Sequence, residues 1–299
     1  MSAEYTRKRQ KDYRPRRNIG RPFALAMLFV LAFALVHTFV LSDASLQPGD
    51  NEIIVAFLDV GQGESILIWS KDNAVLIDGG DVGQHNTVFT YLREAGISRL
   101  DYVIATHPHR DHIGGLIPVL GRLDVAQVLM PDAVHTTTTF EQFIQVIKNN
   151  DIPVHAPHVG ERFEAGIIKF TILAPQHGFG GHLNDASIVL RLEHGATSFL
   201  FTGDAEAASE RGMLGQCIRA DVLSIGHHGS RTSTTEAFLD AVAPMAAVIS
   251  VGADNRFGHP HIEVMERLHV RGISVYTTDT MGTIFMATDG VQIVQLDGW

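Results

Sequence analysis

The stretch YVIATHPHRDHIGG at residues 102–115 determines which fold class the sequence predicts. An apolar run typical of a β-strand leads directly into His107, His109, Asp111 and His112, and a Gly-Gly turn follows. Histidines at i and i+2 point to the same side as a strand ends, and the turn directs Asp111 and His112 back toward that side. Imidazole and carboxylate are ligands of Zn, Mn and Fe. Four such residues within six positions predict a site for two adjacent metal ions, rather than an exposed polar loop.

Further carboxylates and imidazoles follow other apolar runs. Asp78 ends the run VLID, Asp204 ends FLFTGD, and His227 and His228 come directly after VLSIG. Each residue alone could be an ordinary turn residue, but their shared placement at strand ends predicts that they join one site. A carboxylate between two cations can bridge both, and a distant His can complete the second metal position.

Short apolar runs alternate with helical segments along most of the chain. The runs that predict strands are 53–60, 65–69, 74–78, 102–106, 167–173, 187–192, 198–202, 222–225, 247–251 and 274–277. The segments that predict helices are 87–95, 115–120, 140–149, 206–214, 234–242 and 262–270. Strands come first and then alternate with helices, which favours an α/β domain with two sheets and helices outside, spanning residues 52–299.

The N-terminal part of the chain differs in composition from the remainder. Residues 1–22 carry a formal net charge of +6, whereas residues 23–299 carry −16. Residues 23–41 are apolar and uncharged, and as a helix they would span about 28 Å, close to the hydrocarbon core of a bilayer. The basic stretch predicts that the N-terminus stays in the cytoplasm, as the tail of a signal anchor. The domain after the 42–51 linker would then be extracytoplasmic.

Two alternatives to this anchor are a cleaved signal peptide and a buried core helix. A cut after the small residues Ser42 or Ala44 would release a secreted protein. The apolar run is longer than is usual for a signal peptide, and it has no polar face of the kind a core helix shows. We therefore expect a single-pass protein of the cell membrane.

Composition limits the cofactors that the chain can hold. Cys217 is its single cysteine, so an intramolecular disulfide and a thiolate zinc cluster are both excluded, whereas 16 His are present. There is no Gly-Lys-Ser/Thr phosphate loop, so we expect no nucleotide cofactor. The acidic domain repels polyanions at long range, which argues against tight binding of DNA by the domain itself.

Several motifs, taken in order, resemble the metallo-β-lactamase fold superfamily and, more narrowly, the hydrolase domain of the ComEC family of DNA-uptake competence proteins. They are FLDVGQGES (57–65), LIDGG (76–80), THPHRDHIGG (106–115), NDAS (184–187), TGD (202–204), GHHGS (226–230) and NRFGHPH (255–261). The resemblance covers about residues 52–299 and implies a four-layer αββα sandwich. The membrane channel of the competence proteins has no counterpart in this sequence.

The resemblance implies two divalent metal ions, Zn or Mn. His107 and His109 would bind the first ion, and Asp111, His112 and His227 would bind the second. Asp111 is also a candidate catalytic residue that could orient or deprotonate the nucleophile.

One carboxylate and one adjacent imidazole complete the implied site. Asp204 would bridge the two ions, and His228 could replace His227 as a ligand or take a catalytic role. Many relatives have a further His after a middle strand, where this chain has GHLNDAS at residues 181–187. Asn184 is therefore expected to line the site, with His182 as an alternative ligand.

Four more residues are expected around the ions. Asp78 would orient a ligand His through its second ring nitrogen. Ser187, Ser230 and His259 are candidates for contacts to substrate. The predicted function is a membrane-anchored, extracytoplasmic binuclear hydrolase, a phosphodiesterase or nuclease related to competence proteins. The alternatives are a hydrolase of another small ester, such as a phosphocholine ester, and a non-enzymatic protein that keeps the fold.

Overall fold

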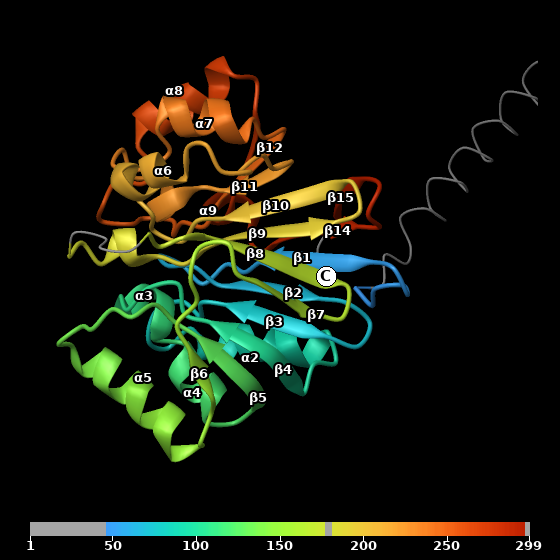
Figure 1. Ribbon diagram of the computed structural model, residues 1–299, viewed down its shortest axis with the longest axis vertical. Helices are drawn as coiled ribbons and strands as arrows, with labels where there is room; N and C mark the ends of the chain where they lie inside the picture. Colours follow the sequence, from blue (N-terminus) through green and yellow to red (C-terminus); the bar gives the residue numbers. More distant parts are fainter. Residues whose placement is uncertain (1–45, 177–180, 297–299) are drawn as a thin grey trace, which may run out of the picture. The chain divides into compact units, whose positions relative to one another are not determined.

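The computed structural model describes residues 46–176 and 181–296 (Figure 1). Two β-sheets form the middle of the domain. The first sheet has the strand order β15-β14-β1-β2-β3-β4-β5-β6. Its strands are β1 (Ile53–Phe57), β2 (Ile66–Trp69), β3 (Ala74–Ile77), β4 (Arg99–Ile104), β5 (Asp124–Leu129), β6 (Val154–His155), β14 (Ile284–Thr288) and β15 (Ile293–Leu296).

The second sheet has the order β13-β12-β11-β10-β9-β8-β7. Its strands are β7 (Arg162–Ala165), β8 (Ile168–Ala174), β9 (Val189–His194), β10 (Thr197–Phe201), β11 (Val222–Ser224), β12 (Ala246–Ile249) and β13 (Ser274–Thr277). Each sheet has a parallel half, β3 to β6 in the first sheet and β10 to β13 in the second. The carboxyl ends of parallel strands meet at one edge of a sheet, where ligand sites of α/β proteins commonly form.

Helices cover the outer face of each sheet, as Figure 1 shows. On the first sheet lie α2 (His85–Glu94), α3 (Arg110–Ile113), α4 (Leu116–Leu120) and α5 (Thr138–Asn149). On the second sheet lie α6 (Ala207–Met213), α7 (Glu236–Val242) and α8 (Ile262–Val270). Short helical turns are η1 (Asn184–Ala186), η2 (Gly226–Gly229) and α9 (Thr278–Met281).

Three apolar cores lie between these layers. Successive residues of a strand pack into the cores on its two opposite faces. In β1, Ile54 and Ala56 pack toward the helices of the first sheet, whereas Ile53, Val55 and Phe57 pack between the two sheets. A third core lies between the second sheet and α6 to α8. Because both faces of the strands are buried, they read as continuous apolar runs instead of alternating ones. The layer order is helix, sheet, sheet, helix, as expected from the motifs.

The structure adds strands that the sequence reading did not include. These are β5, β6, β7, β14 and β15, and β14 pairs with β1, which lies more than 220 residues away in the chain. The predicted membrane helix at 23–41 and its basic tail lie outside the described residues. Within the part of the chain that the structure describes, no helix is long and apolar enough to cross a membrane.

Candidate metal centre

The predicted site residues come together from both sheets. The loop after β4 carries His107 and His109, and the short helix α3 that follows carries Asp111 and His112. In Figure 1, α3 lies at the left end of the first sheet. The loops after β10 and β11 supply Asp204 and the His-His pair of η2 from the second sheet. Each functional side chain therefore follows a buried strand that fixes where its loop begins.

Asp204 occupies the centre of this cluster. It is 3% exposed. Its Oδ1 lies 3.2 Å from Nε2 of His112 and 3.5 Å from Nε2 of His228. Its Oδ2 lies 3.5 Å from Nε2 of His107 and 3.8 Å from Nε2 of His227. A carboxylate whose two oxygens face different imidazoles is placed to bridge two cations.

His107 and His109 converge at one side of Asp204. Nε2 of His107 lies 3.0 Å from Nδ1 of His109. The Thr106 hydroxyl donates to Asp78 Oδ2 over 2.6 Å, and it therefore accepts from Nδ1 of His107 over 3.1 Å. This arrangement leaves the lone pair of His107 Nε2 free to bind a cation. The hydrogen-bond chain thus sets the tautomer of the first ligand.

His112, His228 and Asp111 converge at the other side. Nδ1 of His112 donates to Asp78 Oδ2 over 2.6 Å, and Nδ1 of His228 donates to the Ser250 carbonyl over 2.8 Å. In both rings Nε2 faces the cluster. Nε2 of His228 lies 3.5 Å from Asp111 Oδ2. These three side chains can therefore offer ligand atoms to one ion.

The donor atoms of this cluster fit divalent cations. Among the described residues, Nε2 of His112, Nε2 of His228 and Oδ1 of Asp204 are buried and have no hydrogen-bond partner. Buried polar atoms without partners cost free energy, and a cation would satisfy them. Three sets of three residues place their ligand atoms within 4.8 Å of one another. The two ligand sets of the centre are His107, His112 and Asp204, and Asp111, His112 and His228. In the third set, Glu64, Asp78 and His112, Nδ1 of His112 is bonded to Asp78.

The electrostatics of the cluster favour positive charge at its centre. Burial raises the pKa of Asp204, but the charges of His112 and His228 hold it well below its usual range. Burial lowers the pKa of His112, yet Asp204 and Asp78 raise it well above its usual range. The pKa of His109 falls to about 4, because it is buried and lies beside His107. A metal ion would replace the protons that balance the buried carboxylates.

The two adjacent histidines of η2 point in different directions. Both have left-handed backbones, with φ of 51° for His227 and 54° for His228, a costly conformation for residues other than glycine. The ring of His228 is buried against Asp111 and Asp204, whereas His227 is less buried and its Nδ1 lies 3.1 Å from Glu206 Oε1. The sequence analysis predicted His227 as a ligand of the second metal ion, with His228 as the alternative. The geometry favours His228 as the ligand.

Asn184 was expected to line the site, and its side chain lies beside His227. Its Nδ2 donates to Glu206 Oε1 over 3.0 Å and lies 3.4 Å from Nδ1 of His227. Its Oδ1 is buried without a partner among the described residues. His182, the alternative ligand in this segment, is exposed and belongs to neither set.

The remaining predicted residues surround the cluster. The Ser187 hydroxyl accepts from the backbone N–H of Asp204 over 3.1 Å and so holds the bridging residue in place. The Ser230 hydroxyl lies 3.0 Å from that of Thr232, within the η2 loop. The ring of His259 lies 5.6 Å from that of His227, and burial with the nearby His227 lowers the pKa of His259 to about 4. Of these three residues, Ser187 thus has a clear positioning contact to the cluster.

Sequence reasoning missed Glu64 and Thr106 as parts of the site. Glu64 is buried, and its carboxylate accepts from the Ser224 hydroxyl of the second sheet over 2.9 Å. Its backbone N–H donates to the Asp111 carbonyl over 3.3 Å. Burial and the nearby Asp78 raise the pKa of Glu64 to about 7. Glu64 lies within the FLDVGQGES motif, but a contact between the two sheets leaves no local pattern in the sequence.

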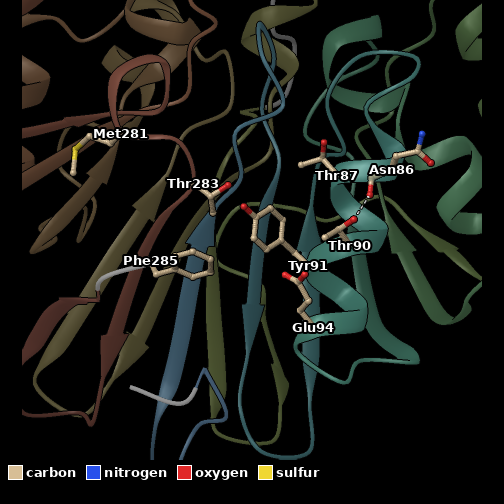
Figure 2. Close-up of a pocket in the computed structure, with 8 residues that line it drawn as sticks. All are labelled: Asn86, Thr87, Thr90, Tyr91, Glu94, Met281, Thr283 and Phe285. Carbon is tan, nitrogen blue, oxygen red and sulfur yellow. Dashed lines mark hydrogen bonds between the residues drawn. The ribbon is translucent and has the colours of Figure 1, made fainter. Parts of the chain in front are cut away.

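A hollow elsewhere on the domain does not carry this chemistry. Figure 2 shows a pocket of about 600 Å³ in which Tyr91 of α2 faces Phe285 of β14. The described residues that line it offer the carboxylate of Glu94 and no imidazole. A separate cavity of about 540 Å³ is lined in part by Asp111 and therefore adjoins the metal ligands.

Comparisons with known proteins agree with this geometry. The profile described as the Metallo-beta-lactamase superfamily matches residues 58–253. The chain is similar to ComE operon protein 3 of Bacillus subtilis (strain 168), with 31% identity over 250 residues, 77% of this chain and 32% of that protein. It is also similar to Recombination protein 2 of Haemophilus influenzae, with 32% identity over 232 residues, 76% of this chain and 28% of that protein. The chain thus spans about a third of the length of these relatives.

Solved structures show the same fold. The metallo-beta-lactamase fold protein YhfI from Bacillus subtilis superimposes with a TM-score of 0.54 at 15% identity, over 79% of this chain and 100% of that chain. CmlA, a diiron beta-hydroxylase from Streptomyces venezuelae, superimposes with a TM-score of 0.53 at 16% identity, over 84% of this chain and 55% of that chain. At these identities the likeness concerns the fold alone.

Proposed function

Because the chain belongs to the metallo-beta-lactamase superfamily and has relatives among the competence proteins, we propose that it is a binuclear metal-dependent phosphodiesterase that acts on DNA or a similar phosphodiester. The central position of Asp204 between two converging sets of donors supports this proposal most directly. Two cations, Zn or Mn, held by these sets would act as Lewis acids and lower the pKa of a bound water toward neutrality.

The residues of the chain would orient the reactants around the phosphate. Asp111 is the most exposed carboxylate of the cluster, and the hydrogen bond to His228 and the charge of His112 lower its pKa against the effect of burial. It is therefore ionised at neutral pH and can accept a hydrogen bond from the attacking nucleophile. His259 is neutral at that pH, so one of its ring nitrogens carries a proton and can donate a hydrogen bond to a phosphate oxygen.

We also propose that the domain is anchored by residues 23–41 and faces the outside of the cell membrane. The apolar length of this segment and the basic residues before it support this topology. A cleaved segment would instead give a secreted enzyme with the same centre.

The proposed activity can be tested by replacing His109 or Asp204 with Ala. Bis-p-nitrophenyl phosphate would be assayed with added Mn²⁺ or Zn²⁺, with p-nitrophenyl phosphocholine beside it to detect a phosphocholine esterase. Each variant should lose at least about 100-fold of the diesterase activity, because even residues that only orient metal ligands cost 10- to 100-fold. His269→Ala on α8, outside the cluster, is the matched control. Undiminished activity in both site variants would reject the assignment.

A further inference from the structure

A cavity of about 540 Å³ opens beside the metal ligands. Its lining includes Arg110 and Asp111 of α3 and residues of the loop between β12 and α8. The described residues that line the cavity are Gln62, Asp81, Arg110, Asp111, Asp254, Asn255, Arg256 and Phe257. Since Asp111 belongs to both the cavity and the metal set, a group bound in this cavity would lie next to the reacting phosphate.

Phe257 presents an aromatic ring to this cavity. The residue is 50% exposed, although large apolar side chains are normally buried. The guanidinium carbon of Arg256 lies 5.0 Å from the centre of its ring. On the way to the metal centre, the Phe257 ring stacks on that of His259 at 5.6 Å with an interplanar angle of 23°. The ring of His259 lies 6.4 Å from that of His228. The rings of Phe257, His259 and His228 therefore form a continuous series from the cavity to the metal ligands.

The loop that carries Phe257 is held in its conformation by Asn255. Oδ1 of Asn255 accepts from the backbone N–H of Phe257 over 3.2 Å and of His259 over 2.9 Å. Its Nδ2 donates to the carbonyls of Gly252 over 2.9 Å and of His259 over 2.6 Å. Four hydrogen bonds from one side chain hold the loop backbone around Phe257 before any ligand binds, which lowers the entropic cost of ordering the loop.

Charge in the cavity does not favour a polyanion. Arg110 is paired with Asp81 over 2.5 Å, and Asp254 adds a further negative charge. Arg256 forms no ion pair with the described residues, and its exposed guanidinium can stack on a planar group. Affinity for a ligand here would therefore come from stacking more than from phosphate contacts.

We propose that this cavity is a base-binding subsite, in which Phe257 and Arg256 take a planar nucleobase next to the phosphodiester at the metal centre. The inference rests on the proposed phosphodiesterase function and adds the class of substrate. A base inside a duplex is already stacked on its neighbours, so the subsite selects single-stranded nucleic acid. Stacking on an aromatic ring accepts any base, because every base has a π-face.

Two substrates with one leaving group test the subsite. Thymidine 5′-p-nitrophenyl phosphate carries a base, whereas methyl p-nitrophenyl phosphate does not. The wild-type protein should show a higher kcat/KM for the thymidine ester. Phe257→Ala and Phe257→Leu should reduce this preference about tenfold, because a stacked base is worth roughly that factor or more. Phe257→Trp should keep the preference, and Val291→Ala, exposed on another part of the domain, should not change it.

A binding measurement provides a second readout. Fluorescence anisotropy of a labelled oligothymidylate with the full-length protein in EDTA should show weaker binding by Phe257→Ala than by wild type. Equal preference for both esters in wild type, or an unchanged preference and affinity in Phe257→Ala, would overturn the subsite and leave the phosphodiesterase standing. Failure of wild type to hydrolyse either ester with Mn²⁺ or Zn²⁺ would instead overturn the proposed function.

Discussion

Asp78 shows how a residue can organise the centre while lying at its back. Its carboxylate accepts from the Thr106 backbone N–H over 2.8 Å, from the Thr106 hydroxyl and from Nδ1 of His112. Through Thr106 it also fixes His107, so one buried carboxylate orients imidazoles of both ligand sets. The sequence analysis expected Asp78 to orient a ligand His through its second ring nitrogen, and the bond to Nδ1 of His112 is a contact of this kind. The role of Thr106 could not be predicted from the sequence, because it depends on a hydroxyl that donates to Asp78 and accepts from Nδ1 of His107.

The two histidines of η2 give a test at the scale of single residues. His228→Ala should remove about one of the two divalent ions proposed for the centre, because its Nε2 faces Asp111 and Asp204. His227→Ala should keep both ions, since its nearest partners are Glu206 and Thr232. Elemental analysis of the purified, dialysed proteins measures this directly. The reverse result would restore His227 as the ligand.

Adjacent residues cannot be separated by spacing alone. Side chains alternate along a strand, but His227 and His228 stand on a left-handed turn after β11, where that rule no longer applies. The sequence therefore narrowed this ligand to a pair, and the backbone conformation was needed to distinguish the two.

At the scale of elements, two glycine turns bring the ligand-bearing segments together. The N–H of Gly79 donates to the His112 carbonyl over 2.8 Å, and the N–H of Gly115 donates to the Gly80 carbonyl over 2.9 Å. A Cβ on Gly115 would overlap the carbonyl oxygen of Gly79. The turn after β3 and the start of α4 therefore touch backbone to backbone, which places Asp78 against His112.

Two glycines at opposite ends of α4 provide a matched comparison. Gly115→Ala should lower the free energy of unfolding by about 1–3 kcal/mol or more, because the two turns must separate. Gly121→Ala meets no atom closer than 3.5 Å and should change it by no more than about 0.5 kcal/mol. Urea unfolding of both variants gives the comparison. An equal effect would show that the close contact at Gly79 does not contribute to stability.

The elements that escaped prediction are those with weak local signals. β5 begins with Asp124 and contains Gln127, so it lacks the continuous apolar run of its neighbours. β14 pairs with β1 and β15 pairs with β14, so both strands depend on a contact between distant parts of the chain. The central strands could be predicted because burial on both faces makes them apolar throughout.

Several buried carboxylates and imidazoles gather at the junction of the two halves of the domain. Each half has its own sheet and outer core, and the apolar core between the sheets joins them. At the edge of that core, carboxylates and imidazoles with unpaired buried atoms replace apolar packing. The resemblance predicted this four-layer arrangement, and the charge balance of residues 23–299 did not reveal where the acidic groups gather.

Removing the metal should therefore lower the stability of the entire domain. Any ligand that binds only the folded state stabilises it, by about 2.7 kcal/mol at a concentration 100 times its dissociation constant. For a domain of this size that corresponds to a fall in Tm of about 5–10 °C when EDTA is added. Calorimetry with wild type and Asp204→Ala measures it, and the variant should respond much less. An identical response of both proteins would mean that the ions act elsewhere.

Because both sheets supply ligands, the metal centre depends on how the two sheets are aligned. A small sliding of one sheet over the other would move Asp204 and His228 away from Asp111 and His112, while the hydrogen bonds inside each sheet stayed intact. Mild heat or denaturant would then abolish the proposed hydrolase activity before circular dichroism detected any loss of strands. Adding back the cation would favour the aligned arrangement of the two sheets, so activity lost in this way should return.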